Sequence, residues 1–172
     1  MENNIIKLRA LEPEDIELLY TWENDTLLWK VSNTIAPFSK YTLKRYIENA
    51  HEDIFDTKQL RLMIVAKDQN KTIGCIDLFD FEPFHQRAGV GILIYEKEDR
   101  SKGYAKEALN VLINYCFNTL GLHQLYCNIT EDNVASIELF TKAGFVQTGC
   151  KIDWLKYCND WKNELTLQLI KE

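Results

Sequence analysis

The spacing of apolar residues predicts seven strands. Residues 60–66 and 72–81 alternate between apolar and polar positions on either side of a polar turn at residues 68–71, and residues 87–95 continue the pattern after a proline-containing loop. Three consecutive strands with short connections predict an antiparallel meander. The same alternation predicts further strands at residues 5–11, 125–129, 145–157 and 161–170.

Four other segments have the spacing of helices. The first opens at Glu12-Pro13, where proline suits the first helical turn, and the second covers residues 39–50 with Ser39 as its cap. Residues 51–57 are expected to be a polar exit from that helix. Residues 103–120 have one wide apolar face, and residues 133–143 form a short helix that is ended by a glycine.

The order of these elements is βααβββαβαββ. The strand at residues 87–95, the helix at residues 103–120 and the strand at residues 125–129 form a βαβ unit, so its two strands are predicted to be parallel. No linker, repeat or low-complexity segment divides the chain. The sequence therefore predicts a single domain over residues 1–172, of the mixed α/β (α+β) class, built on a mostly antiparallel twisted sheet.

The composition and net charge of the chain indicate which kinds of binding partner are expected. Of the 172 residues, 46% are hydrophobic and 27% are charged, which is typical of a globular protein with a sizeable core. The formal net charge of −6 disfavours binding to nucleic acid and favours cationic partners. No segment reaches the roughly 20 apolar residues that cross a bilayer, so no membrane partner is expected.

The cysteines point to a reducing compartment. Five are present without CxxC spacing, mostly in apolar patterns: Cys75, Cys116, Cys127, Cys150 and Cys158. This arrangement predicts buried free thiols rather than disulfides or a zinc site, and no metal is expected. The first seven residues lack the basic start and apolar run of a signal peptide, which predicts a cytoplasmic protein.

One segment has the features of a phosphate-binding loop. Arg100-Ser-Lys-Gly-Tyr-Ala105 lies between a predicted strand and the long helix, where free backbone N–H groups and the helix dipole can hold a phosphate. Gly103 permits close backbone approach, while Arg100 and Lys102 add positive charge. A glycine before a helix is also a common turn or cap, so this segment alone leaves both interpretations open.

A second segment, Asn133-Val-Ala-Ser-Ile-Glu-Leu-Phe-Thr-Lys-Ala-Gly-Phe145, follows the next strand. Together the two segments resemble the GNAT superfamily of acetyl-CoA-dependent N-acetyltransferases. The (Gln/Arg)-x-x-Gly-x-(Gly/Ala) signature of that family is matched by Arg100, Gly103 and Ala105, and its second signature is matched everywhere except at Phe140. The resemblance covers nearly the whole chain and is to the branch that contains spermidine and ribosomal-protein acetyltransferases.

This resemblance implies a GNAT fold in which two parallel strands splay apart and hold the pantetheine arm of acetyl-CoA like an added strand. The pyrophosphate is then expected on residues 100–105, and Asn133 is expected to bond the arm, although a cap explains that residue equally well. The implied cofactor-binding residues are Ile92, Leu93, Ile94, Arg100, Ser101, Lys102, Gly103, Tyr104, Ala105, Asn133, Ser136, Phe140 and Lys142.

Three positions depart from the catalytic pattern of relatives. Many members carry a tyrosine that protonates the leaving thiolate, but Phe140 has no hydroxyl. Gly89 stands where related spermidine enzymes tend to have a glutamate, and Asn128 stands near the position of a glutamate in some protein acetyltransferases. The acid and the base must therefore come from elsewhere, or positioning alone must carry the reaction.

The remaining carboxylate and histidine candidates lie on or just after the strand at residues 72–81. Glu82 is the first candidate base, acting through water, His85 is the second, and Tyr126 is a substitute acid. Asp77, Asp80 and Glu82 are the expected substrate-binding residues, because grouped carboxylates suit a cationic acceptor. Each of these side chains also fits a surface, turn or packing role.

The leading hypothesis is therefore acetylation of a primary amine by direct attack in a ternary complex, with spermidine or another small amine as acceptor. One alternative is acetylation of a peptide N-terminus, and another is a domain that binds acetyl-CoA without catalysis. The aromatic tail with Trp154, Tyr157 and Trp161 predicts either an interface in a homodimer or larger homo-oligomer, or local packing across a hairpin.

Overall fold

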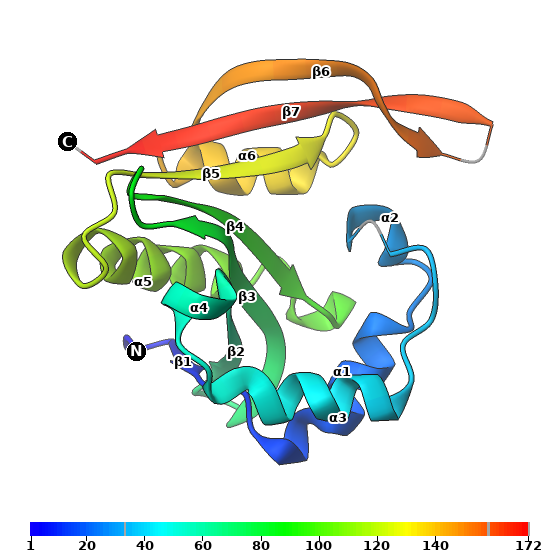
Figure 1. Cartoon of the computed structure of the whole chain (residues 1–172), viewed down its shortest axis with the longest axis vertical. Coiled ribbons are helices and arrows are strands. Elements are labelled where there is room, and N and C mark those ends of the chain that lie inside the picture. The colour runs from blue at the N-terminus through cyan, green and yellow to red at the C-terminus, as the bar shows by residue number, and fades with distance from the viewer. Residues whose placement is uncertain (33, 158, 172) are drawn as a thin grey trace.

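One seven-stranded sheet organises the chain (Figure 1). The computed structural model describes residues 1–32, 34–157 and 159–171. Its strands are β1 (Ile6–Arg9), β2 (Leu60–Ala66), β3 (Lys71–Glu82), β4 (Arg87–Ile94), β5 (Gln124–Thr130), β6 (Val146–Tyr157) and β7 (Asp160–Ile170). They lie in the order β1-β2-β3-β4-β5-β7-β6, and among these neighbours β4 and β5 form the parallel pair while the others are antiparallel. The predicted meander and βαβ unit are confirmed.

Four helices lie where the apolar spacing predicts them: α1 (Ile16–Glu23), α3 (Lys40–Glu48), α5 (Tyr104–Asn118) and α6 (Val134–Lys142). Pro13 begins a 3₁₀ turn, Pro13–Asp15, that leads into α1. The hydroxyl of Ser39 accepts a hydrogen bond of 3.0 Å from the backbone N–H of Thr42, so Ser39 caps α3 as predicted.

The expectation of only four helices is wrong, because α2 (Trp29–Ser32) and α4 (Ile54–Thr57) are also helical. The polar exit after α3 contains a 3₁₀ turn, Asn49–His51, and then α4. The carboxylate of Asp53 starts α4 by accepting a hydrogen bond of 2.7 Å from the backbone N–H of Phe55. A helix of one turn is too short to show an apolar period, which is why the pattern gave no sign of it.

Helices cover both faces of the sheet and divide the core in two. On one face α5 and α6 pack against β1 to β5, with Leu109, Leu112 and Phe140 among the buried side chains. On the other face α1 and α3 cover a smaller cluster that includes Leu19 and Met63. Each face therefore has its own apolar packing.

The β6–β7 hairpin extends past β5 towards α2 (Figure 1). The Nζ atom of Lys30 on α2 lies 4.7 Å from the centroid of the Tyr157 ring at the end of β6. This cation–π contact joins the hairpin to the N-terminal helices. The aromatic tail thus packs partly within the chain, while Trp154 and Trp161 remain exposed.

Three of the predicted thiols are buried and free. Burial raises the pKa of Cys116 and of Cys127 to about 12, and it raises the pKa of Cys75 further. Cys150 is free but exposed on β6, so its predicted burial is wrong. Cys158 lies outside the described residues.

Candidate active site

The parallel strands β4 and β5 pair over only three residue pairs, which end at Gly89 and Tyr126. Beyond this point β4 continues to Ile94 and β5 to Thr130, each bonded only to its other neighbour, and Figure 1 shows the two strands diverging. The backbone groups of residues 90–94 that face β5 therefore have no sheet partner within the described chain. A ligand with amide groups can bind there as an added strand, as expected for Ile92, Leu93 and Ile94.

The loop after β4 uses its basic side chains internally. The guanidinium of Arg100 donates hydrogen bonds of 3.0 and 2.8 Å to the backbone oxygens of Ile94 and Tyr95, at the end of β4. The ammonium of Lys102 lies 3.1 Å from the carboxylate of Asp99. The positive charges expected to face a phosphate are thus partly engaged by the protein itself.

The backbone N–H groups of this loop remain available to a phosphate. Ser101 and Gly103 both have left-handed backbone conformations, with φ of 60° and 88°. In the described structure no side chain caps the first turn of α5, and the N–H of Glu107 is the first to bond back to Gly103. Alternating conformations of this kind turn successive N–H groups into a concave anion site, which fits the pyrophosphate of the predicted cofactor.

The second predicted cofactor segment forms α6. Asn133 caps this helix through its side-chain oxygen, which accepts a hydrogen bond of 3.3 Å from the backbone N–H of Ser136. Phe140 lies in the core with its ring edge-to-face against Phe145, at a centroid distance of 5.0 Å. Lys142 pairs on the exposed side of the helix with Glu138. These side chains have clear structural roles, and cofactor contacts at α6 stay a prediction.

Three of the predicted catalytic and substrate-binding residues meet in one open pocket of about 580 Å³: Asp80, Glu82 and Tyr126. Its lining includes both members of the first β4–β5 pair, Arg87 and Gln124, and reaches Tyr126 of the last pair, after which the two strands separate. Sequence reasoning missed its other polar lining residues, which are Lys58, Arg87, Gln124, Thr166 and Gln168. The alternation of β5 and β7 places Gln124, Thr166 and Gln168 on the same face as Tyr126 and could have found these three positions.

Tyr126 and Asp80 are bonded to each other. The Tyr126 hydroxyl donates a hydrogen bond of 3.0 Å to Oδ2 of Asp80. Burial, followed by the hydrogen bond to the Asp80 carboxylate, raises the pKa of Tyr126 to about 12. Asp80 lies in an irregular part of β3 and has a left-handed backbone with φ of 48°. This bulge re-aims the Asp80 side chain towards β5.

Gly89 makes room for the aromatic contact beside this bond. A Cβ atom on Gly89 would overlap the Phe79 ring, which lies against the sheet face at that position. The Phe79 and Tyr126 rings meet edge-to-face at a centroid distance of 5.9 Å. The missing side chain at Gly89 therefore lets groups from β3 and β5 meet across β4.

The other predicted site residues are placed differently. His85 is exposed and packs against Phe84, and it does not line the pocket. Both carboxylate oxygens of Asp77 accept hydrogen bonds from Arg61, at 2.8 and 2.9 Å, so this charge is already paired. Arg61 also contacts Glu23 on α1, which ties α1 to the sheet.

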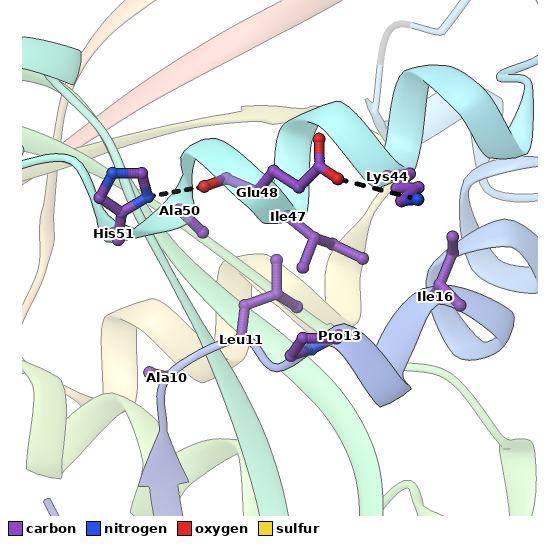
Figure 2. Close-up of a pocket in the computed structure, with 9 residues that line it drawn as sticks. All are labelled: Ala10, Leu11, Pro13, Ile16, Lys44, Ile47, Glu48, Ala50 and His51. Atoms are coloured by element: carbon purple, nitrogen blue, oxygen red, sulfur yellow. Dashed lines mark hydrogen bonds and ion pairs between the residues drawn. The ribbon is translucent and has the colours of Figure 1, made fainter.

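A second pocket lies away from the strand opening, between the β1–α1 connection and α3 (Figure 2). Its floor includes Leu11 and Ile47, and the Lys44–Glu48 pair and His51 stand at its rim. None of the predicted catalytic or cofactor-binding residues lines it. Within the described residues no group of three or more His, Cys, Asp or Glu side chains could hold a metal, and no helix is long and apolar enough to cross a membrane.

A sequence model of the acetyltransferase (GNAT) domain matches residues 6–146. The spermidine N(1)-acetyltransferase of Vibrio cholerae is 27% identical over 147 residues, which cover 86% of this chain and 82% of that protein. An uncharacterized N-acetyltransferase of Bacillus subtilis, YoaA, is 31% identical over 152 residues, which cover 87% of this chain and 84% of its own length.

Solved structures share the fold. The crystal structure of spermidine N-acetyltransferase from V. cholerae in complex with CoA and spermine superposes with a TM-score of 0.87 at 23% identity, covering 98% of this chain and 96% of that one. A dodecameric structure of the V. cholerae enzyme superposes with a TM-score of 0.79 at 24% identity, covering 98% and 95% of the two chains. At these identities the likeness concerns the fold alone.

Proposed function

Because the chain belongs to the GNAT acetyltransferase family, whose members use acetyl-CoA, we propose that it moves an acetyl group directly to a primary amine in a ternary complex. The observation that carries this proposal is the pocket containing Asp80, Glu82 and Tyr126, in which Tyr126 belongs to the last β4–β5 pair before the strands separate. The acetyl donor binds on the open side of this point, and the amine binds in the pocket. Acetyl-CoA supplies the acetyl group as a thioester.

On the donor side, the chain contributes mainly backbone groups. Residues 92–94 offer the unpaired edge of β4 to the amide groups of the pantetheine arm. The loop from Ser101 to Ala105 offers N–H groups to the pyrophosphate, and the uncapped start of α5 adds its dipole. Arg100 holds this loop against the end of β4 through the backbone oxygens of Ile94 and Tyr95.

On the acceptor side, Glu82 is the base. An alkyl amine with a pKa of about 10.4 is mostly protonated near neutral pH, so it must lose a proton before its lone pair can attack. The Glu82 carboxylate lines the pocket and has one oxygen 3.2 Å from the backbone N–H of Phe84, which orients the group. A water molecule between Glu82 and the amine would carry the proton. His85 is second choice because it lies outside the pocket lining.

Tyr126 is the hydrogen-bond donor to charge that develops during transfer. Its raised pKa of about 12 keeps the phenol protonated at neutral pH. A thiol with a pKa of about 8.5 leaves readily as the thiolate, so a hydrogen bond from a weakly acidic phenol is sufficient. Before transfer, the hydrogen bond to Asp80 orients the Tyr126 hydroxyl. This arrangement supplies the donor that the buried Phe140 lacks.

A polyamine such as spermidine is the preferred acceptor. The V. cholerae relative is a spermidine N(1)-acetyltransferase, and the chain carries a net charge of −6, which attracts polycations. Asp80 and Glu82 are the two carboxylates that line the pocket and can bind ammonium groups. Asp77 is a weaker candidate because Arg61 already neutralises it.

A peptide N-terminus is the second candidate acceptor, and one observation favours it. Lys58 and Arg87 line the same pocket as Asp80 and Glu82, so the pocket presents both signs of charge. A peptide N-terminus has an amine close to carbonyl or carboxylate oxygens, so it can pair with both the negative and the positive side chains of the pocket. A third possibility, binding of acetyl-CoA without catalysis, is supported by the absence of a hydroxyl at Phe140.

The three candidate functions are distinguished by measuring thiol release from acetyl-CoA with a panel of acceptors. The panel contains spermidine, spermine, putrescine, lysine, amino sugars and peptides with free N-termini. Saturable turnover with a polyamine, lost in Glu82→Gln and kept in Phe140→Tyr and in the exposed control Glu52→Gln, is the expected result. Turnover with peptides alone would replace the polyamine with the second candidate. Binding of acetyl-CoA without turnover of any acceptor would overturn catalysis.

We also propose that the chain forms a homo-oligomer. Ile152, Trp154 and Trp161 on the β6–β7 hairpin expose 69%, 56% and 50% of their surfaces, and a V. cholerae relative has a dodecameric structure. Large exposed side chains on an edge strand are typical of interfaces. Sedimentation analysis should give a mass above one chain that falls in Trp154→Ser, and a monomeric wild-type protein would contradict the proposal.

A further inference from the structure

The loop that follows β4 has a strained backbone. Ser101 adopts φ of 60° without being a glycine, and Gly103 adopts φ of 88° two residues later. A side chain in the left-handed region costs about 1 kcal/mol, so such a conformation persists only where neighbouring contacts hold it. The contacts that hold this loop come from an unexpected part of the chain, the turn between β2 and β3.

Tyr104 makes the first of these contacts. Its ring is buried in the core at the start of α5, and its hydroxyl reaches the turn. There it donates to the carboxylate of Asp68, with distances of 3.0 and 2.8 Å to the two oxygens, and it accepts a hydrogen bond of 3.1 Å from the amide of Gln69. The hydrogen bond to Asp68 raises the pKa of Tyr104, so the phenol stays protonated as the donor.

Asp99 makes the second contact, on the other side of Ser101. Its side chain is 3% exposed and lies between the ammonium groups of Lys71, at 2.9 Å, and Lys102, at 3.1 Å. Lys71 is the first residue of β3, directly after the turn. The hydrogen bond from Lys71, together with that from Lys102, lowers the pKa of Asp99 and keeps it ionised. The strained segment is thus fixed to the same turn at both of its ends.

We propose that the β2–β3 turn, through Asp68, Gln69 and Lys71, positions the N–H groups of residues 101–105 for the pyrophosphate of acetyl-CoA. This inference rests on the proposed binding of the cofactor to that loop. Asp68 and Gln69 are positioning residues, since they act through Tyr104 and lie apart from the pocket that holds Asp80, Glu82 and Tyr126. The turn therefore controls affinity for the cofactor, while the chemical groups for transfer lie elsewhere.

The test is the affinity for CoA by calorimetry, together with steady-state kinetics, for Tyr104→Phe, Asp68→Ala and Asp68→Asn. Tyr104→Phe keeps the buried ring, and Asp68 is exposed, so these variants should fold. We expect Tyr104→Phe and Asp68→Ala to weaken CoA binding and raise the KM for acetyl-CoA about 10-fold, the effect of one hydrogen bond to a charged group. The kcat and the KM for the amine should change less than about two-fold. Asp68→Asn, which retains an acceptor oxygen, should recover part of the affinity, and Tyr41→Phe, at an exposed position of α3, is the matched control.

The possible results separate the inference from its premise. Because both substitutions break the Tyr104–Asp68 bond, the double variant Asp68→Ala/Tyr104→Phe should lose no more affinity than Tyr104→Phe alone, which also removes the bond from Gln69. Wild-type affinity for CoA in both single variants, even with a lowered Tm, would overturn the positioning role and leave a purely structural contact. Failure of the wild-type protein itself to bind CoA would overturn the proposed cofactor site, and the positioning role with it.

Discussion

The hydroxyl of Tyr126 on β5 donates a hydrogen bond to Asp80 on β3, although β4 lies between these strands in the sheet. The two residues are separated by 46 positions in the sequence. The bulge at Asp80 and the absence of a side chain at Gly89 together permit this crossing. The bond lies where β4 and β5 stop pairing, so it joins the sheet geometry to the proposed chemistry.

Removing the Tyr126 hydroxyl should slow transfer without harming cofactor binding. Tyr126→Phe keeps the ring contact with Phe79 but loses the hydrogen-bond donor, so we expect kcat to fall about 10- to 100-fold. The KM for acetyl-CoA should stay within about two-fold of the wild-type value. Thiol release at saturating acceptor measures both quantities, with Tyr41→Phe as control. An unchanged kcat would remove Tyr126 from the mechanism.

The pH dependence of the rate should have one rising limb over the accessible range. The proposed attack needs a neutral amine, so kcat/KM should increase as the pH approaches the amine pKa of about 10.4. The Tyr126 donor is present below its own pKa of about 12 and is lost only above it, so its ionisation should cause no decline between about pH 8 and 10. A falling limb in this range that disappears in Tyr126→Phe would contradict the raised pKa.

A side chain at Gly89 should destabilise the sheet through Phe79. Gly89→Ala places a Cβ against the Phe79 ring, and we expect the free energy of unfolding to fall by about 1–3 kcal/mol. Urea denaturation measures this loss. In the background of Phe79→Ala the same substitution should cost much less, because the obstructing ring is absent. Equal costs in the two backgrounds would show that the ring is not the obstacle.

Asp99 should give the protein a pH-dependent stability at acidic pH. Its folded pKa is lowered below the ordinary 3.8, chiefly by the hydrogen bond from Lys71, so the ionised form favours the folded state. This contribution is fully present above the unfolded pKa and is lost as the pH falls through the lower folded pKa. Asp99→Asn should therefore be less stable than wild type at pH 7, with the difference shrinking below about pH 4 in denaturant titrations. A difference independent of pH would exclude this ion pair as its source.

Much of the fold could be read from local pattern. The seven strands, four of the helices, the parallel pair, the helical start at Pro13 and the cap at Ser39 follow from apolar spacing and from the residues that begin helices. The two one-turn helices α2 and α4 could not be predicted, because a single turn is too short to show the helical period of apolar residues. The sequence indicated Gly103 only as a place of close backbone approach or a turn, and the structure shows that this glycine adopts a left-handed conformation, which glycine does without cost.

The chain by itself determined where the strands and helices form, which family signature its loop carries and which residue types could do the chemistry. Tertiary structure decided which of those side chains are available. Arg100 and Lys102 bond to the protein, Asp77 is paired with Arg61, and Asp80 reaches Tyr126. The Asp77–Arg61 and Asp80–Tyr126 pairings join separate strands, and they depend on register, on one bulge and on one missing Cβ. Arg100 and Lys102 instead bond to residues three to six positions away, in and before their own loop. A local pattern of apolar and polar residues specifies faces and periods, and it does not specify which side chains meet across them.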